Sequence, residues 1–586
     1  MRQWMVAAKK ADFYVIAEKF HVDPVVARII RNREVIGEKN IRIYLGGNLS
    51  DLSDPHQMKD MDRLVEILAQ KIRKQVHIRI IGDYDVDGVT SSHLFLTALR
   101  RVGAKVDVVI PHRIQDGYGL SLHLLQQAKE DGVDTILTCD NGIAAIDEIA
   151  WAKAQKMTVL VTDHHAVPFE EHEGRRTEKK SLADAVVNPH QQDCGYPYKE
   201  LCGAGVAWNV IRVLYENYDM DKREAEDLLD FVAMATVCDV MSLTGENRIL
   251  VKEGLKRIRH TKNIGLQALM QACNVQPENI SAYHFGYVLG PCVNATGRLD
   301  TARHALRLFE TGQETEAEEI ARDLVDLNQE RKELTLQGVE MAKKLCEEGG
   351  YENDPVLVLF LPDVHESIAG LIAGRIREMY NRPVFVLTRG EEGVKGSGRS
   401  TENYSMYENM CGCAELFTKF GGHPMAAGLS LPEENVEKFR RKINENCPLT
   451  VGEVCPDIHI DMAMPVGYAS TELVHQFALL EPFGKDNPSP LFADRNLSIS
   501  RMWVIGKNRN VLRMSVLSEY GQPVPVIFFG DVETLFAYFT EKFGQEEVEN
   551  ALHGRKNRIL FSMVYTAKID FYQGNENLQL EMKYYR

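Results

Sequence analysis

Three aspartates stand on alternate residues at the end of an aliphatic run, in the stretch VHIRIIGDYDVDGVTSSHLF. They are Asp83, Asp85 and Asp87. The mutual repulsion of three carboxylates is costly unless a cation neutralises it. A surface turn is the plainer alternative, because Asp and Gly are common turn residues. The motif therefore indicates either a turn or a cation site, and its surroundings must decide.

Two other strand-like segments also end in groups that could bind a cation. Asp140 follows DTILTC, and the run Asp163, His164 and His165 follows MTVLVT. A further acid, Asp239, lies inside the apolar stretch VAMATVCDVMSL, where an unpaired carboxylate would be expensive. Each residue taken alone has a structural interpretation as a helix cap, a turn residue or a buried histidine.

The segments that carry these residues alternate between strand-like and helix-like patterns from about residue 76 to residue 190. Short aliphatic runs such as KVDVVIP and DTILTCD are separated by amphipathic stretches such as LSLHLLQQAKEDG. This alternation predicts parallel βαβ units in a doubly wound α/β sheet. Ligands of such sheets bind beyond the carboxyl ends of the strands. We therefore expect the acids and imidazoles to meet at one edge of one sheet, which isolated turns and caps do not explain.

Carboxylates and imidazoles without thiolates are the ligands that suit hard or borderline divalent ions such as Mn²⁺ or Mg²⁺. Six or seven ligands are too many for one ion and suit a pair about 3.5–4 Å apart. Water that bridges such a pair is acidified and can attack phosphorus in line. The residues thus predict a two-metal centre for phosphoester chemistry.

The rest of the chain predicts further domains and a long connection. Residues from about 200 to 260 have a helical pattern, and a highly charged helical stretch between about 302 and 348 is expected to span two domains. A second α/β region opens with DPVLVLFLP, and the chain ends in short strands separated by glycines, which suggest a small β-barrel. The expected parts are an N-terminal helical or extended segment (1–65), a first α/β domain (66–260), a helical connector (261–348), a second α/β domain (349–450) and a barrel (451–586).

The composition limits the class of protein and its partners. The 586 residues are 44% hydrophobic and 26% charged, with a formal net charge of −16. This charge argues against a generally basic protein that coats nucleic acid, although a local basic groove or bound metal could still contact nucleic acid. No apolar segment is long enough to cross a bilayer, and Lys9 and Lys10 interrupt the N-terminal segment where a signal peptide would be apolar. We therefore expect a cytoplasmic protein with no membrane partner.

The 11 cysteines are dispersed through the chain. An odd, scattered set indicates reduced thiols rather than a disulfide framework. Cys411 and Cys413 form a CxC pair without a second pair at zinc spacing, so we expect no structural zinc.

The motifs together resemble those of a known family. DYDVDG, DNG, DHH and the acid of ATVCDVM look like the successive motifs of the DHH phosphoesterase superfamily. PHRIQDGYGLS, VVNPHQ, LCGAGVAW, GPCVNATGRLDTA, GSGRS and GGHPMAAGLS follow in the order expected of the RecJ family, the bacterial single-strand-specific exonucleases. The last segment, with LEPFGKDNPSPLF, resembles the OB-fold that follows the DHHA1 domain in that family. The resemblance covers nearly the whole chain from about residue 40 and implies DHH, DHHA1 and OB-fold domains.

The resemblance also implies a metal site that holds two divalent ions, Mn²⁺ or Mg²⁺. Some relatives have a further histidine ligand two residues before the first aspartate, where this chain has Ile81. Asp83 could therefore bind metal directly or act from behind a ligand, and Asp163 is expected to orient the histidines. The implied metal ligands are Asp83, Asp85, Asp87, Asp140, His164, His165 and Asp239. All of them except Asp83 are also expected to be catalytic.

Family members hold a 5′-terminal phosphate with arginines near the metals. The matching residues are Arg113 and Arg298, with Asn294 beside them. Arginine suits this task because its planar fork pairs with two phosphate oxygens, whereas a surface salt bridge is the alternative for each. In the second α/β domain, the resemblance implies that Ser397, Arg399 and His423 contact the nucleotide, and with Arg113, Asn294 and Arg298 they form the expected substrate-binding set.

The barrel segment RMWVIGKNRNVLR combines basic residues with an aromatic one and has no acid. Such a surface fits single-strand binding on an OB-fold. Alternation along a strand could equally bury Trp503 in the barrel. The expected DNA-binding residues are Trp503, Lys507, Arg509 and Arg513.

The predicted function is a metal-dependent exodeoxyribonuclease that degrades single-stranded DNA from 5′ to 3′ and releases 5′ mononucleotides in repair and recombination. The resemblance implies a channel that excludes duplex DNA, a monomer, and a helicase and a single-strand-binding protein as partners. A phosphodiesterase for short oligonucleotides or cyclic dinucleotides is the alternative, but such relatives are generally shorter and lack the terminal barrel. A non-catalytic DNA-binding scaffold would have degraded ligand positions, and here the acid and histidine set is intact.

Overall fold

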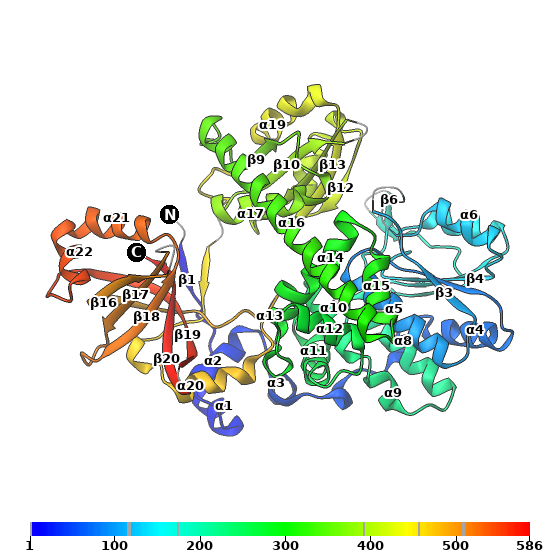
Figure 1. The fold of residues 1–586 in the computed structure, drawn as a ribbon, viewed down its shortest axis with the longest axis horizontal. Coiled ribbons are helices and arrows are strands. Elements are labelled where there is room, and N and C mark those ends of the chain that lie inside the picture. The colour runs from blue at the N-terminus through cyan, green and yellow to red at the C-terminus, as the bar shows by residue number, and fades with distance from the viewer. Residues whose placement is uncertain are drawn as a thin grey trace. The chain divides into compact units, whose positions relative to one another are not determined.

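The computed structural model of the chain contains two compact units (Figure 1). One unit comprises Leu52–Pro456, and the other combines Gln3–Asp51 with Asp457–Arg586. The structure describes residues 3–113, 116, 119–172, 175–390, 393–454, 457–506, 510–572 and 574–586. Across these ranges no helix combines the length and the apolar character that a membrane crossing requires.

The first unit opens with the parallel sheet that the aliphatic runs predict. Its strand order is β3-β2-β4-β5-β8, and every neighbouring pair is parallel. The central strands are buried on both faces, as expected where helices cover a parallel sheet. The strands are β2 (Ile78–Ile81), β3 (Val106–Val109), β4 (Thr135–Cys139), β5 (Thr158–Thr162) and β8 (Ala185–Val187). The doubly wound α/β class is therefore confirmed.

Three helices connect these strands, namely α5 (Val86–Arg101), α6 (Leu122–Glu130) and α7 (Ile146–Ala154). Helix α5 is almost completely buried, because α8 (Gly203–Asn217) and α10 (Leu229–Cys238) pack against it. The mostly buried α10 and α8 therefore clamp the helix that carries the DYDVDG motif.

The charged stretch between about 302 and 348 is two helices rather than one, α15 (Arg303–Glu310) and α16 (Glu314–Glu348). The break falls at Thr311, whose backbone is extended and which precedes a glycine. The first half of α16 packs against the helices α12 (Ile264–Ala272) and α14 (Gly290–Leu299) that follow the first α/β region, where the Asn328 amide donates to the Cys292 sulfur at 3.3 Å. Its other end shares a core with the second α/β region. Helix α16 thus connects the two regions within this unit.

The second α/β region is a mixed sheet of order β12-β13-β11-β10-β9. Only β9 and β10 pair in parallel, and the remaining neighbours are antiparallel. Helix α17 (Glu366–Tyr380) packs with α16 over one core of the sheet, and α19 (Val436–Glu445) packs into another. The strands are β9 (Leu357–Phe360), β10 (Val384–Arg389), β11 (Val394–Arg399), β12 (Lys419–His423) and β13 (Ala426–Leu431).

The second unit contains the expected β-barrel. Its sheet closes because β16 pairs with β17 on one side and with β19 on the other. Alternating residues of the strands point into the core, as in small barrels. The long strands are β16 (Phe492–Ile505), β17 (Val511–Leu517), β18 (Pro523–Phe529), β19 (Leu560–Tyr572) and β20 (Asn575–Tyr585).

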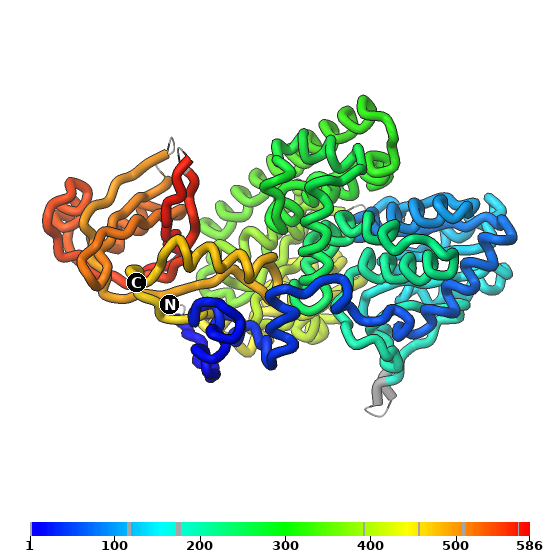
Figure 2. The backbone as a smooth tube through the Cα atoms, turned by 90° about the horizontal axis from the view of Figure 1, so that it is seen from below, coloured from blue at the N-terminus to red at the C-terminus, as the bar shows by residue number. Residues whose placement is uncertain are grey.

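The N-terminal residues pack onto this barrel, although they are distant from it in the sequence. Helices α1 (Phe13–Phe20), α2 (Pro24–Asn32) and α3 (Glu38–Gly46) contribute buried residues to the barrel's hydrophobic core. Figure 2 shows the blue N-terminal helices beside the orange segments of the same unit. The guanidinium of Arg33 also pairs with the buried carboxylate of Asp461 at 2.8 Å. These contacts give the N-terminal segment a structural role in the barrel unit.

Candidate active site

The DYDVDG motif forms the turn from β2 into α5, and this turn brings its aspartates together. Asp85 caps the helix, because its Oδ1 accepts a hydrogen bond from the Gly88 amide at 3.0 Å. Asp87 follows in the first helical turn, and Asp83 lies between strand and helix. A Cβ on Gly88 would come within 2.4 Å of the Asp83 carbonyl oxygen, so this tight turn requires glycine.

The start of α8 holds Asp87 in place. The amides of Gly203 and Ala204 donate to the two carboxylate oxygens of Asp87, at 2.6 and 2.8 Å. Helix N-termini stabilise negative charge through such free amides. A Cβ on Gly203 would lie 2.6 Å from the Cβ of Asp140, so only glycine allows this approach. The small residues of LCGAGVAW thereby position two carboxylates at once.

The imidazole of His164 lies at the centre of the cluster. Its Nε2 is 3.0 Å from an oxygen of Asp140 and 3.6 Å from an oxygen of each of Asp87 and Asp239. Asp140 follows β4, His164 follows β5, and Asp239 caps the C-terminus of α10. The sheet edge and a separate helix therefore supply acids to one point.

Three groups of potential metal ligands overlap in this cluster, and within each group the ligand atoms lie within 4.8 Å of one another. The group of Asp140, His164 and His165 is the central one. It shares Asp140 with the group that contains Asp83 and Asp85, and it shares His164 with the group that contains Asp87 and Asp239. Sharing makes them one continuous centre with room for more than one cation. The groups together contain Asp83, Asp85, Asp87, Asp140, His164, His165 and Asp239, which are all seven residues expected as metal ligands.

The electrostatics of the cluster fit a divalent cation. Burial and then the neighbouring carboxylates raise the pKa of Asp83 and of Asp140 well above their ordinary value. Burial lowers the pKa of His164, which favours the neutral imidazole that binds metals. Both carboxylate oxygens of Asp83 are buried without a hydrogen-bond partner. Buried polar atoms are normally satisfied, so these atoms mark a place where a cation fits.

Asp163 holds the DHH segment from behind. Its carboxylate accepts hydrogen bonds from the Ile143 amide at 2.9 Å and the His164 amide at 2.7 Å, and it lies 2.8 Å from Nδ1 of His165. Burial alone would lower the pKa of His165, but this contact and the nearby carboxylates raise it to about 9. A carboxylate bound to the far nitrogen of a ligand histidine fixes the orientation of the ring.

A cavity of about 560 Å³ lies next to this centre and is lined by arginines. Tyr84, between two aspartates of the motif, forms part of its wall, and the Arg113 guanidinium lies 5.0 Å from the Tyr84 ring centroid. Arg298 donates to the Ser367 carbonyl at 2.6 Å, and Arg399 donates to the Gly398 carbonyl at 2.7 Å. Burial and the other arginines lower the pKa of Arg298, to about 10, and that of Arg399. Such a positive cavity suits a phosphate group.

The remaining residues of the expected substrate-binding set lie in different surroundings. Ser397 lines the arginine cavity, and its hydroxyl is 3.2 Å from Arg399. Asn294, on α14 (Gly290–Leu299), accepts a hydrogen bond from the Val86 amide at 3.2 Å and so ties this helix to the metal motif. His423 is exposed at the end of β12 and does not line the cavity.

The expected DNA-binding residues of the barrel are described in part. Trp503 is 38% exposed, and Arg513 pairs with it across strands β16 and β17. Both line a groove of about 430 Å³, and the Arg501 guanidinium lies 5.7 Å from the Trp503 ring centroid. Of the two alternatives for Trp503, the structure therefore shows the surface position and not burial inside the barrel. Two other residues of this set, Lys507 and Arg509, lie outside the described residues.

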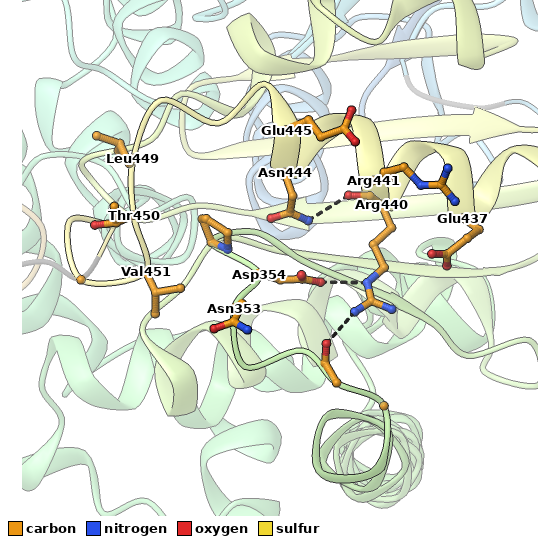
Figure 3. Close-up of a pocket in the computed structure, with 14 residues that line it drawn as sticks. Asn353, Asp354, Glu437, Arg440, Arg441, Asn444, Glu445, Leu449, Thr450 and Val451 are labelled. Atoms are coloured by element: carbon orange, nitrogen blue, oxygen red, sulfur yellow. Dashed lines mark hydrogen bonds and ion pairs between the residues drawn. The ribbon is translucent and has the colours of Figure 1, made fainter.

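A larger hollow of about 890 Å³ lies between α19 and the end of α16 (Figure 3). One of its two arginines, Arg440, pairs with Asp354 at 2.8 Å and donates to the Gly350 carbonyl at 3.1 Å (Figure 3). The Arg440 guanidinium also lies 3.7 Å from the Tyr351 ring centroid. Because acids such as Glu437 and Glu445 line this hollow beside its arginines, the smaller and more positive cavity next to the acidic cluster is the better phosphate site.

Comparisons with known proteins agree with this arrangement. Three family models match, namely the DHH family N-terminal domain over 77–236, the DHHA1 domain over 353–447 and the RecJ OB domain over 460–584. The single-stranded-DNA-specific exonuclease RecJ of Haemophilus influenzae is 32% identical over 96% of this chain and 96% of its own length. The chain belongs to the RecJ family. The RecJ of Bacillus subtilis is also 32% identical over 86% of this chain, which spans 63% of that protein's length.

A solved RecJ structure shares the fold. The crystal structure of Thermus thermophilus RecJ in complex with Mn²⁺ matches with a TM-score of 0.81 and 25% identity, over 100% of this chain and 79% of that chain. The same protein has been solved with Mg²⁺, and there the TM-score is 0.75 at 24% identity. Both ions are of the kind that the carboxylate and imidazole cluster predicts.

Sequence reasoning missed several contributors to this RecJ-family site. The amides of Gly203 and Ala204 escape notice because backbone donors leave no side-chain signature, although the small residues at a helix start hint at close approach. Tyr84 and Lys395 line the arginine cavity. Tyr84 lies inside the DYDVDG motif, and this position in the sequence could have indicated that its side chain lies close to the metal ligands.

Proposed function

We propose that this RecJ-family chain is a metal-dependent exonuclease that degrades single-stranded DNA from its 5′ end and releases 5′ mononucleotides in repair and recombination. One observation carries the proposal, the shared wall between the acidic cluster and the arginine cavity. Tyr84 lines that cavity, while its neighbours Asp83 and Asp85 belong to the metal-ligand groups. A phosphate bound by the arginines would therefore lie beside the metal centre. The Haemophilus influenzae relative is named as a single-stranded-DNA-specific exonuclease.

The acidic cluster holds two divalent ions, Mn²⁺ or Mg²⁺, with the seven ligands described above. Such a pair acidifies water and stabilises the attacking and leaving oxygens of an in-line displacement at phosphorus. The protein contributes the placement of its ligands. The α8 amides orient Asp87, and Asp163 orients His165. Preformed ligands of this kind need little rearrangement during the reaction.

The arginine cavity sets the register of cleavage. Arg113 and Arg298 pair with the 5′-terminal phosphate, and Arg399 with Ser397 contacts the same nucleotide from the second α/β region. Recognition of a chain end limits cleavage to the first internucleotide phosphate, because only that phosphate then lies at the metals. Asn294 and His423 remain predicted contributors to substrate binding, as do the barrel residues around Trp503.

Several finer points belong to the same proposal. The chain acts as a monomer in the cytoplasm, and a helicase and a single-strand-binding protein are its partners. The competing activity, hydrolysis of short oligonucleotides or cyclic dinucleotides, gains no support, because the chain continues into a RecJ OB domain over 460–584. Such a barrel serves a long strand rather than a dinucleotide.

The test is digestion of single-stranded DNA with Mn²⁺ or Mg²⁺, analysed for 5′ mononucleotides. The wild-type protein releases them, and Asp140→Ala abolishes the release. Asp147→Ala, which changes an exposed acid in the first turn of α7, is the matched control and retains activity. A wild-type protein that releases no mononucleotide, or an Asp140→Ala variant that releases it normally, would sink the proposal.

Two altered substrates test the separate parts of the proposal. A 5′-hydroxyl strand lacks the group that the arginines recognise, so its cleavage is slower than that of the 5′-phosphorylated strand. A blunt duplex with a 5′ phosphate resists digestion if the channel admits a single strand alone. Equal rates on both single strands would remove the phosphate pocket from the proposal while leaving the metal centre intact.

A further inference from the structure

Two exposed tyrosines stack on each other near the metal centre. Tyr283 is 62% exposed and Tyr287 is 71% exposed, so neither ring belongs to the hydrophobic core. Their ring centroids are 5.1 Å apart, and the rings are inclined by only 24°. Offset stacking of this kind leaves an aromatic face open to solvent. The pair offers a flat apolar surface on a highly charged protein.

The element that carries these rings is attached to the metal centre. Tyr287 lies in η4 (Phe285–Leu289), a π-helical turn, and such turns occur frequently at functional sites. The Cys238 thiol at the end of α10 donates to the Phe285 carbonyl at 3.3 Å, and a Cβ on Gly290 would lie 2.3 Å from the Cys238 sulfur. Asp239, a member of the metal-ligand groups, follows Cys238 directly. The tyrosine-bearing turn therefore packs on the support of a metal ligand.

Helix α14 continues from this turn and links the rings to the phosphate cavity. Asn294 and Arg298 are four residues apart on α14, a spacing that keeps two side chains on one face of an α-helix, and Tyr287 lies in the π-helical turn that leads into this helix. Asn294 contacts the backbone between the motif aspartates, and Arg298 lines the phosphate cavity. The rise of a helix gives about 6 Å between the levels of Asn294 and Arg298, and about 10 Å between Tyr287 and Asn294. The helix thus leads from the phosphate cavity, past the metal motif, to the turn that carries the tyrosines.

We propose that Tyr283 and Tyr287 form a base-stacking platform that holds the substrate strand on the 3′ side of the cleaved phosphate. This inference rests on the proposed exonuclease function and adds a contact to it. The 5′ phosphate binds at Arg298, and the first internucleotide phosphate lies at the level of Asn294. The bases about three nucleotides further on reach the tyrosines, since stacked bases rise about 3.4 Å each.

The chemistry of the rings favours a nucleic-acid strand as the occupant. Every base has a π-face, so stacking on tyrosine holds a strand regardless of its sequence, as an exonuclease that accepts any sequence requires. Stacking also needs no positive charge, which agrees with a protein whose net charge is −16. The turn that carries the rings continues directly into the helix that carries Asn294 and Arg298, and a protein partner on the rings would obstruct the strand there.

The first test compares long and short substrates. In the Tyr283→Ala/Tyr287→Ala double variant, KM for a long 5′-phosphorylated strand rises by roughly tenfold or more, because each lost base–aromatic stack weakens binding by a factor of that order. Hydrolysis of a 5′-phosphorylated dinucleotide, which ends before the platform, stays at the wild-type rate. The double phenylalanine variant keeps both rings and behaves as wild type. Tyr14→Ala removes a tyrosine that is 77% exposed elsewhere and serves as the control.

The second test locates the contact on the strand. In the wild-type protein, abasic sites at the third to fifth nucleotides raise KM, and in the double alanine variant they have no further effect. A 5-iodouracil at these positions cross-links to Tyr283 or Tyr287 under ultraviolet light. An unchanged KM for the long strand, or an equal loss on the dinucleotide, overturns the platform, and the latter indicates a structural role. A wild-type protein that does not cleave single-stranded DNA refutes the proposed function instead.

Discussion

The metal centre and the arginine cavity are opposite in charge but alike in construction. In the metal centre, burial and then neighbouring carboxylates raise the pKa of Asp83 and of Asp140, and in the cavity burial and then neighbouring guanidinium groups lower the pKa of Arg298 and of Arg399. Each region therefore concentrates charge of one sign against its own repulsion, with Tyr84 on the wall between them. A fold keeps such arrangements where a ligand supplies the opposite charge. Divalent cations suit the first region, and a phosphate group is the ligand proposed above for the second.

Removal of one charge from the acidic cluster has the largest expected effect on activity. Asp140→Asn lowers the rate of mononucleotide release by at least about a thousandfold, because the metal pair stabilises several kcal/mol of transition-state charge. Burial and the neighbouring carboxylates raise the pKa of Asp140, so the ionised form destabilises the metal-free fold. The same variant therefore unfolds at a higher temperature than wild type in EDTA.

Two measurements check this prediction, namely the single-turnover rate with Mn²⁺ and thermal unfolding with EDTA. An Asp140→Asn protein that is less stable than wild type without metal would show that Asp140 makes structural contacts, and the analogy with the arginine cavity would fail. Asp147→Asn, at an exposed site, leaves both the rate and the unfolding temperature unchanged.

Removal of one charge from the arginine cavity has the next largest expected effect on activity. Arg298→Met lowers kcat/KM on a 5′-phosphorylated strand by about a hundredfold, since a charged hydrogen bond to phosphate contributes roughly 2–3 kcal/mol. On a 5′-hydroxyl strand the variant equals wild type, because the partner of the guanidinium is already missing. Arg298→Lys restores the activity only in part, because an ammonium cannot form the planar fork.

Metal affinity separates the two regions in this experiment. Titration of Arg298→Met with Mn²⁺ gives the wild-type affinity, whereas Asp140→Asn loses it. Arg303→Met, at an exposed position on α15, is the matched control and cleaves both strands normally. Equal losses on phosphorylated and unphosphorylated strands would contradict a role of Arg298 in binding the terminal phosphate.

The part of this site that lies on the parallel sheet could be predicted from the sequence, because strand ends in such a sheet meet at one edge. The aliphatic runs before Asp83, Asp140 and His164 are β2, β4 and β5, and their ends meet as expected. Asp239 was harder to place, since it follows α10 and no strand pattern points to it. Only the family resemblance assigned it to the same centre.

Contacts between distant segments lay beyond prediction from the sequence. The amphipathic helix α2 buries Val25, Val26, Ile29 and Ile30, but an apolar helix face does not indicate which surface covers it. The answer is a barrel more than 400 residues later in the chain, as shown by the side-chain bonds of Asn32 and Arg33 to Asp461. Strand alternation likewise left Trp503 open, and only the register of β16 with β17 places it on the surface.

A smaller effect is expected from the carboxylate behind the metal centre. Asp163→Asn lowers the affinity for Mn²⁺ by about 10- to 100-fold, because a partner that orients a ligand histidine contributes that much. The ligands themselves stay in place, so saturating Mn²⁺ restores most of the activity. Isothermal titration and a rate measurement over increasing Mn²⁺ concentration check this. Loss of activity that saturating Mn²⁺ does not recover would mean that Asp163 acts in the reaction itself.

The smallest effect concerns a buried ionisable group outside both charged regions. His93 on α5 lies between the rings of Phe231 and Phe309, at centroid distances of 4.4 and 5.9 Å. Burial, with a contribution from the charge of Arg100, lowers its pKa to about 3. The protonated imidazole is thus disfavoured in the fold but not in the unfolded chain, whose histidine pKa is about 6.5. Its contribution to stability is complete above about pH 6.5 and is lost as the pH falls towards 3.

At about pH 5.5 the linkage amounts to about 1.4 kcal/mol, or tenfold in the folding equilibrium. His93→Leu cannot be protonated, so its unfolding midpoint in urea with EDTA falls correspondingly less than that of wild type between about pH 7.5 and pH 5.5. His260→Leu, at an exposed histidine, keeps the wild-type dependence on pH. If His93→Leu followed the wild-type profile, the buried imidazole would have to be charged in the fold. Burial alone would then not govern ionisation here, and the pKa shifts in the two charged regions would need another cause.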